Sequence, residues 1–185
     1  MARPKRTLSV MATTEPASAI VVRIRIPTAL ERLRARWDRA ASDGVPAHVT
    51  ILFPFLPSRR LSPAVRRELA VIAAATEPFG VRFARIERFP GVVYAAPEPS
   101  GPFVRLTDAF AARFPEHRPY GGAFDTVVPH LTIAEAPDAP LDDIVNEASA
   151  ILPFEGRVRG LEVLVQDGEG QWRGRWRLAL GRPID

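Results

Sequence analysis

The stretch PAHVTI at residues 46–51 returns as PHLTI at residues 129–133, and this duplicated motif decides the fold. Each copy precedes a helical segment and then a similar strand, PFGVRFARIERF at 78–89 and PFEGRVRGLEVL at 153–164. A strand–helix–strand–strand unit that occurs twice predicts two lobes related by a pseudo-twofold axis. We therefore expect an α/β fold with two pseudo-symmetric lobes of antiparallel-rich sheet and flanking helices around a central cleft.

The other segments also predict alternating strands and helices. Runs of β-branched residues indicate strands, a Ser-Pro pair indicates the start of a helix, and Pro/Gly pairs indicate turns. Ser62 and Thr28 are the expected helix caps. Expected strands cover 19–27, 48–56, 79–89, 92–96 and 130–136, with a closing hairpin of 154–166 and 171–180, and expected helices cover 29–41, 62–76, 103–114 and 141–152. Residues 1–18 are predicted to form a disordered tail, and residues 19–185 a single bilobal domain.

The composition is that of an ordinary globular protein, with 46% hydrophobic and 25% charged residues among 185. The absence of cysteine excludes a disulfide scaffold, a thiol nucleophile and a thiolate metal site. The formal charge of +4, from 25 basic and 21 acidic residues, either suits a polyanionic partner or reflects codon usage. No apolar run approaches the roughly 20 residues that span a bilayer. We expect a cytoplasmic monomer that is not associated with a membrane.

The H-x-T triplets each place a histidine and a threonine on one face of a strand, because residues i and i+2 point the same way. His48 projects with Thr50, and His130 with Thr132. A single triplet is also the ordinary pattern of a half-exposed strand, so the duplication is what indicates function. One neutral and one protonated imidazole beside a phosphate supply the base and acid of phosphodiester cleavage. The threonine hydroxyls are suited to donate hydrogen bonds to phosphate oxygens.

With both motifs in this order and spacing, the chain resembles the two-histidine phosphoesterases, the superfamily that includes 2′-5′ RNA ligases and 2′,3′-cyclic phosphodiesterases. The mark of this family is a duplicated His-x-Thr/Ser-x motif with hydrophobic x, which HVTI at 48–51 and HLTI at 130–133 match. The likeness extends over about 19–180, and the segment 89–110 is similar to the family's central strand and helix.

The resemblance implies a cleft between two lobes and catalysis without a metal or another cofactor. By motif position, it makes His48 and His130 the catalytic residues and Thr50 and Thr132 the phosphate-binding residues. The stretch ILFPFLP at 51–57 departs from the form common in the RNA-end branch of the family. The resemblance therefore implies the chemistry and leaves the substrate open.

Two further residues are candidates for contact with a substrate. Tyr94 stands where relatives often have an aromatic residue, so it either stacks on a base or packs in the core. Arg177 alternates with Arg173 and Arg175 along the last expected strand, so this face meets either phosphate or solvent. His117 lies in a Pro-rich loop and is predicted to be solvated. The three tryptophans are assigned to core or hairpin packing.

Two functions from different classes remain open. The favoured one is a metal-independent phosphodiesterase that hydrolyses a cyclic or 2′-linked phosphodiester of a nucleotide or RNA end, with two histidines as general acid and base. The alternative is a non-catalytic RNA- or nucleotide-binding module on the same fold. Two intact H-x-T motifs favour the enzyme. The sequence decides neither the substrate nor which histidine is the base.

Overall fold

The computed structural model describes residues 17–124, 126–136 and 138–181. Its strands are β1 (Ser18–Arg23), β2 (His48–Leu52), β3 (Phe79–Phe89), β4 (Val92–Glu98), β5 (Leu131–Glu135), β6 (Phe154–Val158), β7 (Gly160–Gln166) and β8 (Trp172–Ala179). Its helices are α1 (Thr28–Trp37), α2 (Arg39–Ser42), α3 (Pro63–Ala74), α4 (Gly101–Arg113) and α5 (Leu141–Ser149), with 3-10 turns at Ser58–Arg60 and Pro119–Gly122. The strands form two four-stranded sheets, β2-β1-β7-β8 and β5-β4-β3-β6, with antiparallel neighbours throughout. The predicted α/β class with antiparallel sheets is confirmed.

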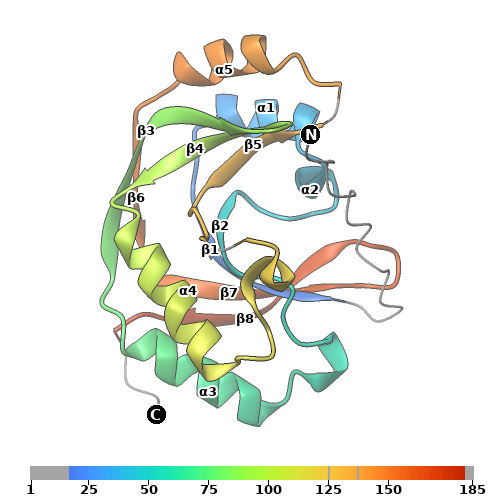
Figure 1. The fold of residues 1–185 in the computed structure, drawn as a ribbon, viewed down its shortest axis with the longest axis vertical. Coiled ribbons are helices and arrows are strands. Elements are labelled where there is room, and N and C mark those ends of the chain that lie inside the picture. The colour runs from blue at the N-terminus through green and yellow to red at the C-terminus, as the bar shows by residue number, and fades with distance from the viewer. Residues whose placement is uncertain (1–16, 125, 137, 182–185) are drawn as a thin grey trace, which may run out of the picture.

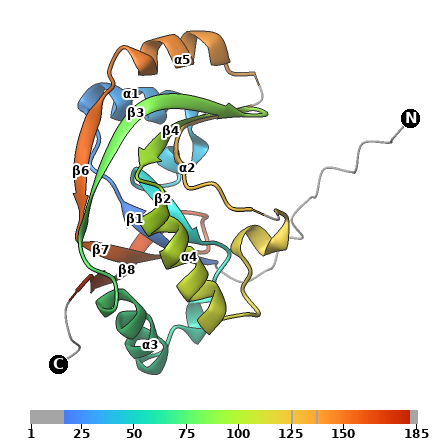
Figure 2. The same cartoon turned by 60° about the vertical axis from the view of Figure 1, so that its left-hand side comes forward.

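Helices cover one face of each sheet (Figure 1). α1 and α5 pack on the sheet that contains β5, whereas α4 packs on β2 and α3 on β8. β2 and β5 are the edge strands of their two sheets, and they contact each other. Figure 2 shows β6 leading from the second sheet into β7 of the first. The fold therefore brings the two strands of the repeated motif to one place.

Strand alternation explains why these segments fold as they do. Val49 and Ile51 of β2 are buried in the core, and so are Leu131 and Ile133 of β5. The histidines and threonines that alternate with these aliphatic residues are only half-buried. The aliphatic residues hold each edge strand against its helices, because their burial removes apolar surface from water. The polar positions are left on the opposite face, as the sequence predicted.

The expected continuous strand over 154–166 is wrong, because this segment forms two strands in different sheets. β6 pairs with β3, whereas β7 pairs with β1 and β8. The break falls at Arg159, whose carbonyl accepts a hydrogen bond from the Leu180 N–H. At Gly160 a Cβ would lie 2.7 Å from the Leu178 carbonyl oxygen, so the close strand approach requires glycine. Each sheet consequently combines the H-x-T strand of one repeat with the closing hairpin of the other.

Two termini of expected elements also need correction. Ser18, predicted to lie in the tail, is the buried first residue of β1, and its hydroxyl donates to the Leu56 carbonyl. The rest of that tail, residues 1–16, lies outside the described residues, as do residues 182–185 of the predicted domain. The strand from His48 ends at Leu52.

The helix starts and stops follow local hydrogen bonding. The Ser62 hydroxyl caps α3 by accepting from the Val65 N–H at 3.3 Å, which confirms the predicted cap. Thr28 is instead the first residue of α1, which has no side-chain cap. The expected helix 29–41 is interrupted at Asp38, whose extended backbone and side chain cap α2. None of the helices within the described ranges is long and hydrophobic enough to cross a membrane.

Candidate active site

The two repeated histidines are anchored in the same way. His48 Nδ1 lies 2.8 Å from the Pro46 carbonyl oxygen, and His130 Nδ1 lies 2.7 Å from the Val128 carbonyl oxygen. In both cases the acceptor belongs to the residue two positions earlier. Because a carbonyl can only accept, each Nδ1 carries the proton and donates it. Nε2 is then the nitrogen that takes up or releases a proton, and both imidazoles are held in the same orientation.

The environment of His48 keeps its imidazole neutral. Burial lowers its pKa to about 4, and the charges of Arg34 and His130 act in the same direction. The Pro46 carbonyl and the Asp38 carboxylate oppose this shift without cancelling it. An imidazole with a pKa well below neutrality carries a lone pair at pH 7 and can accept a proton. His48 begins β2 and His130 directly precedes β5, and these two strands contact each other.

Tyr120 links the two halves of this site, although nothing in the sequence singled it out. Its ring stacks on the His130 ring with centroids 6.4 Å apart. Burial raises the pKa of its hydroxyl, while the nearby Thr50 side chain opposes the rise. Its N–H donates to the Phe53 carbonyl at 2.6 Å. The backbone has φ 52°, a left-handed conformation that bulky residues rarely adopt and that clusters at functional sites.

The two threonines lie beside the histidines but have different partners. Thr50 Oγ1 is 3.1 Å from His48 Nε2. The Thr132 hydroxyl is half-buried and makes no hydrogen bond to any residue in the described part of the chain. Both hydroxyls are donors that a phosphate oxygen can use. A phosphate that approaches His48 would have to displace the contact between Thr50 and His48.

A buried ion pair that the sequence did not reveal supports β5 from behind. Arg34 Nη2 lies 2.6 Å from Asp38 Oδ2, and both side chains are at most 2% exposed. Arg34 Nε also donates to the Thr132 carbonyl at 3.0 Å, and Asp38 Oδ1 accepts from the Ala40 N–H at 3.0 Å. A buried ion pair is retained only when further hydrogen bonds satisfy its members, as they do here. The pair therefore ties α1 to the strand that carries Thr132.

Tyr94 packs behind His130. Its ring centroid lies 5.5 Å from that of His130 and 4.3 Å from that of Phe89, and the residue is 3% exposed. Its hydroxyl donates to Glu87 at 3.0 Å; burial, with help from Glu87, raises its pKa to about 12. Of the two alternatives for Tyr94, the structure favours packing over contact with a substrate, because little of its surface is accessible.

Arg177 lies on the histidine face of the first sheet. Its Cα partner is Glu162 of β7. Glu162 in turn pairs with Val21 of β1, and Val21 pairs with Thr50 of β2. Paired residues of neighbouring strands point to the same side. Arg177 Nε donates to Glu162 at 3.0 Å, yet its side chain is 79% exposed. Arg23, the partner of His48 in β1, is a further cation on this face that sequence reasoning missed.

An apolar cavity of about 250 Å³ adjoins His48 and Thr50. Trp172 and Phe53 meet edge-to-face along it, with ring centroids 6.0 Å apart. The other lining residues are Ala19, Val21, Ala40, Val45 and Leu164. Trp172, which the sequence assigned to packing, is thus part of a hollow that reaches the candidate catalytic residues. A flat apolar group fits such a lining better than a charged one does.

His117 is not the solvated residue that the sequence predicted. Its side chain is only 16% exposed and its ring meets Phe55 edge-to-face at 5.5 Å. The Nε2 atom is buried and has no hydrogen-bond partner among the described residues. Those residues contain no group of three or more His, Cys, Asp or Glu side chains placed to hold a metal ion.

Comparison with known proteins finds relatives of this chain. A family model described as the 2′-5′ RNA ligase superfamily matches residues 22–170 of the chain. A protein of Geobacillus kaustophilus (strain HTA426), named as a proposed phosphoesterase, GK0864, is 26% identical to this chain over 154 residues. The matched region covers 80% of this chain and 86% of that protein.

Solved structures share the fold at low sequence identity. TT0787 of Thermus thermophilus has a TM-score of 0.57 and 21% identity, over 89% of this chain and 98% of that one. E. coli LigT complexed with NADP+ has a TM-score of 0.54 and 18% identity, over 91% and 99% of the two chains. LigT complexed with 3′-AMP has a TM-score of 0.52 and 16% identity, over 91% and 100%.

Proposed function

The chain belongs to the 2′-5′ RNA ligase superfamily, whose model spans most of its length, and on that premise we propose that it is a metal-independent phosphodiesterase. Its substrate is a cyclic or 2′-linked phosphodiester of a nucleotide or RNA end. The observation that carries the proposal is the matched anchoring of His48 and His130 through Nδ1, which leaves the Nε2 atom of each ring to exchange a proton with the substrate.

In the proposed reaction His48 is the general base and His130 the general acid. The depressed pKa of His48 supports this assignment, because a base must be unprotonated when the substrate binds. Nε2 of His48 takes a proton from water as the water oxygen attacks phosphorus. The bond from phosphorus to the leaving oxygen breaks, and the protonated His130 gives its proton to that oxygen. The product is a phosphomonoester with a free hydroxyl.

The hydroxyls beside the histidines stabilise the charge that develops on the non-bridging oxygens. Thr50 and Thr132 are proposed to donate to these oxygens, on which negative charge builds in the transition state. Tyr120 acts as a positioning residue, because it contacts both Thr50 and His130. Its strained backbone supports this role, since such strain persists where surrounding contacts fix a functional geometry.

The apolar cavity next to His48 supports a nucleotide over a phosphodiester without a base. A base is flat and has an aromatic face that stacks on side chains such as Trp172 and Phe53. LigT, which shares the fold, has been crystallised with 3′-AMP, ATP and NADP+. These ligands are compatible with the proposal for this chain. A cytoplasmic location and a monomeric state remain sequence-based predictions.

The proposal is tested by a screen of nucleoside 2′,3′-cyclic phosphates, 2′-5′-linked dinucleotides and oligonucleotides with a 2′,3′-cyclic end. We expect at least one class to give a phosphomonoester in phosphorus NMR, with turnover that survives exhaustive treatment with EDTA. Binding of these compounds without turnover would instead support the non-catalytic module. Loss of turnover in EDTA that one divalent ion restores would contradict the metal-independent mechanism.

The assignment of His48 as the base predicts an imidazole that titrates far below 6.5 in the free protein. Burial disfavours the protonated form of His48 in the folded protein, and the charges of Arg34 and His130 disfavour it further. The Pro46 carbonyl and the Asp38 carboxylate favour that form but do not outweigh burial. Ring-nitrogen NMR, assigned with a His48→Gln variant, should place the pKa near 4. In the same range, kcat/KM should rise with pH as His48 loses its proton. A His48 titration at or above 6.5 would show that the roles are not distributed in this way.

A further inference from the structure

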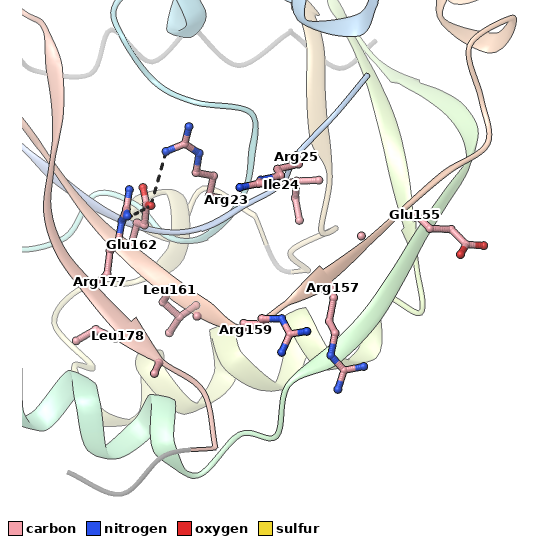
Figure 3. A pocket seen from close by; sticks show the side chains of 13 residues that line it. Arg23, Ile24, Arg25, Glu155, Arg157, Arg159, Leu161, Glu162, Arg177 and Leu178 are labelled. Carbon is pink, nitrogen blue, oxygen red and sulfur yellow. Dashed lines mark hydrogen bonds and ion pairs between the residues drawn. The ribbon is translucent and has the colours of Figure 1, made fainter. Parts of the chain in front are cut away.

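A second hollow, larger than the apolar cavity beside His48, is lined by arginines from three strands and the segments next to them (Figure 3). It has a volume of about 710 Å³ and lies where β1, β6, β7 and β8 meet. We call it the arginine pocket, after the cations that line it: Arg23, Arg25, Arg157, Arg159 and Arg177. Five arginines against two glutamates leave a formal excess of three positive charges.

Three of these arginines have no acidic partner in the described part of the chain. The side chains of Arg25, Arg157 and Arg159 make no hydrogen bond or ion pair with any residue in the ranges 17–124, 126–136 and 138–181. All three are exposed, so water solvates them in the absence of a ligand. Like charges gathered around one hollow focus a positive potential there. The pocket is therefore suited to an anion.

The two carboxylates of the pocket offset only part of its positive charge. Glu162 is shared by two cations, Arg23 at 3.9 Å and Arg177 at 3.0 Å. Glu155 is engaged by Arg82 at 3.0 Å, and in Figure 3 it points away from the arginines. Glu162 therefore offsets one charge of the pocket's own Arg23 and Arg177, whereas Glu155 is paired outside the pocket. The charges of Arg25, Arg157 and Arg159 remain available to a bound group.

The arginine pocket is continuous with the face that carries the candidate catalytic residues. Arg23 is the Cα partner of His48, and it lines both the arginine pocket and a neighbouring hollow of about 530 Å³. That hollow also includes Pro46, the residue whose carbonyl holds His48. At the far side, Arg177 lies three strands from Thr50, or about 14 Å at the usual strand spacing. A single extended ligand can therefore reach both places.

From this geometry we propose that the arginine pocket binds a second phosphate of the substrate, one that is not cleaved. The inference rests on the proposed function, because it assigns the scissile phosphate to His48 and His130. It requires a substrate with two phosphate groups about 10–15 Å apart, which excludes a simple cyclic mononucleotide as the preferred ligand. An oligonucleotide end and a nucleotide with a further terminal phosphate share this chemistry.

The test compares three substrates that have the same 2′,3′-cyclic end: a nucleoside, its 5′-triphosphate and a tetranucleotide. We expect kcat/KM to be at least about tenfold higher for one of the two longer substrates, and the better of the two identifies the source of the second phosphate. Arg157→Gln/Arg159→Gln should lower that kcat/KM by about tenfold, because charge-assisted hydrogen bonds are lost. Turnover of the cyclic nucleoside should not change.

Arg32→Gln/Arg36→Gln is the matched control, because it removes the same charge from exposed positions of α1, away from the pocket. It should leave all three rates unchanged. An effect of the pocket variant on all substrates alike, or no preference for a longer substrate, would overturn the inference.

A binding arm separates this inference from the proposed function. Anisotropy of a labelled tetranucleotide with a plain 3′-phosphate reports occupancy without turnover. Affinity should fall with salt, and the pocket variant should reduce the slope of log K against log[salt] by about 0.7 for each lost phosphate contact. Binding that depends on Arg157 and Arg159 while no phosphodiester is cleaved would reject the proposed function and keep the pocket. If the substrate is turned over but the unmodified protein and the pocket variant bind the tetranucleotide equally well, the proposed function is kept and the pocket is rejected.

Discussion

Asp38→Ala is expected to lower the free energy of unfolding by about 3–5 kcal/mol, the usual cost of removing one member of a buried ion pair. The guanidinium of Arg34 is 2% exposed, and Asp38 is its acidic partner at 2.6 Å. Without that carboxylate the guanidinium keeps the Thr132 carbonyl as an acceptor but loses its counter-ion. The cap on the Ala40 N–H is lost as well. Urea denaturation with an unchanged m-value measures the effect.

The controls separate burial from charge. Glu68→Ala breaks an ion pair to Arg113 that is nearly as short, 2.7 Å, but whose side chains are 38% and 53% exposed. It should cost less than about 1 kcal/mol, as exposed pairs usually do. Arg34→Met/Asp38→Leu should recover part of the stability, because apolar side chains fill the space without an unpaired charge. A loss below about 1 kcal/mol in Asp38→Ala would show that water screens the pair.

The sequence predicted the elements that follow from local patterns. The alternation in HVTI and HLTI assigns Val49 and Leu131 to the core and the histidines to the other face, and the structure agrees. Ser62 followed by proline predicted the start of α3 correctly. These features depend on residues within a few positions of one another, so one segment of sequence contains the whole signal.

The supporting residues of the site could not be predicted, because their contacts join distant segments. Arg34 looks like a surface arginine in an Arg-rich helix, yet its partner carbonyl belongs to Thr132, 98 residues later. Tyr120 lies in a loop rich in Pro and Gly, and only the folded chain brings it to Thr50 and His130. Trp172 begins a hairpin strand, where packing is the common role of tryptophan.

The division of 154–166 between two sheets is a further case in which tertiary structure overrides a local pattern. Every segment of this run favours a strand, and the sequence has no proline or turn dipeptide inside it. Only the positions of β3 and β1, in different sheets, require the chain to change partners near Arg159. This crossing brings Arg157 and Arg159 beside Arg23 and so forms the arginine pocket.

His48→Ala and His130→Ala are each expected to lower kcat by about 10²–10⁴-fold, the usual contribution of one general base or acid. Each variant removes the Nε2 atom that takes or gives the proton and leaves the hydroxyls of Thr50 and Thr132 in place. KM should therefore change much less than kcat. Thr50→Val and Thr132→Val should have smaller effects on kcat, because each deletes one hydrogen bond to the developing charge. Steady-state kinetics on the substrate found in the screen measure all four.

The double variant His48→Ala/His130→Ala gives the sharpest result. Residues that act as one unit are strongly non-additive, so the double variant should be little slower than the worse single variant. His117→Ala is the matched control, because this third histidine packs against Phe55 outside the site and its loss should leave kcat unchanged. If either single variant of the pair keeps near-normal kcat while remaining folded, the acid–base pair is the wrong mechanism. Multiplicative losses in the double variant would mean that the two imidazoles act in separate steps.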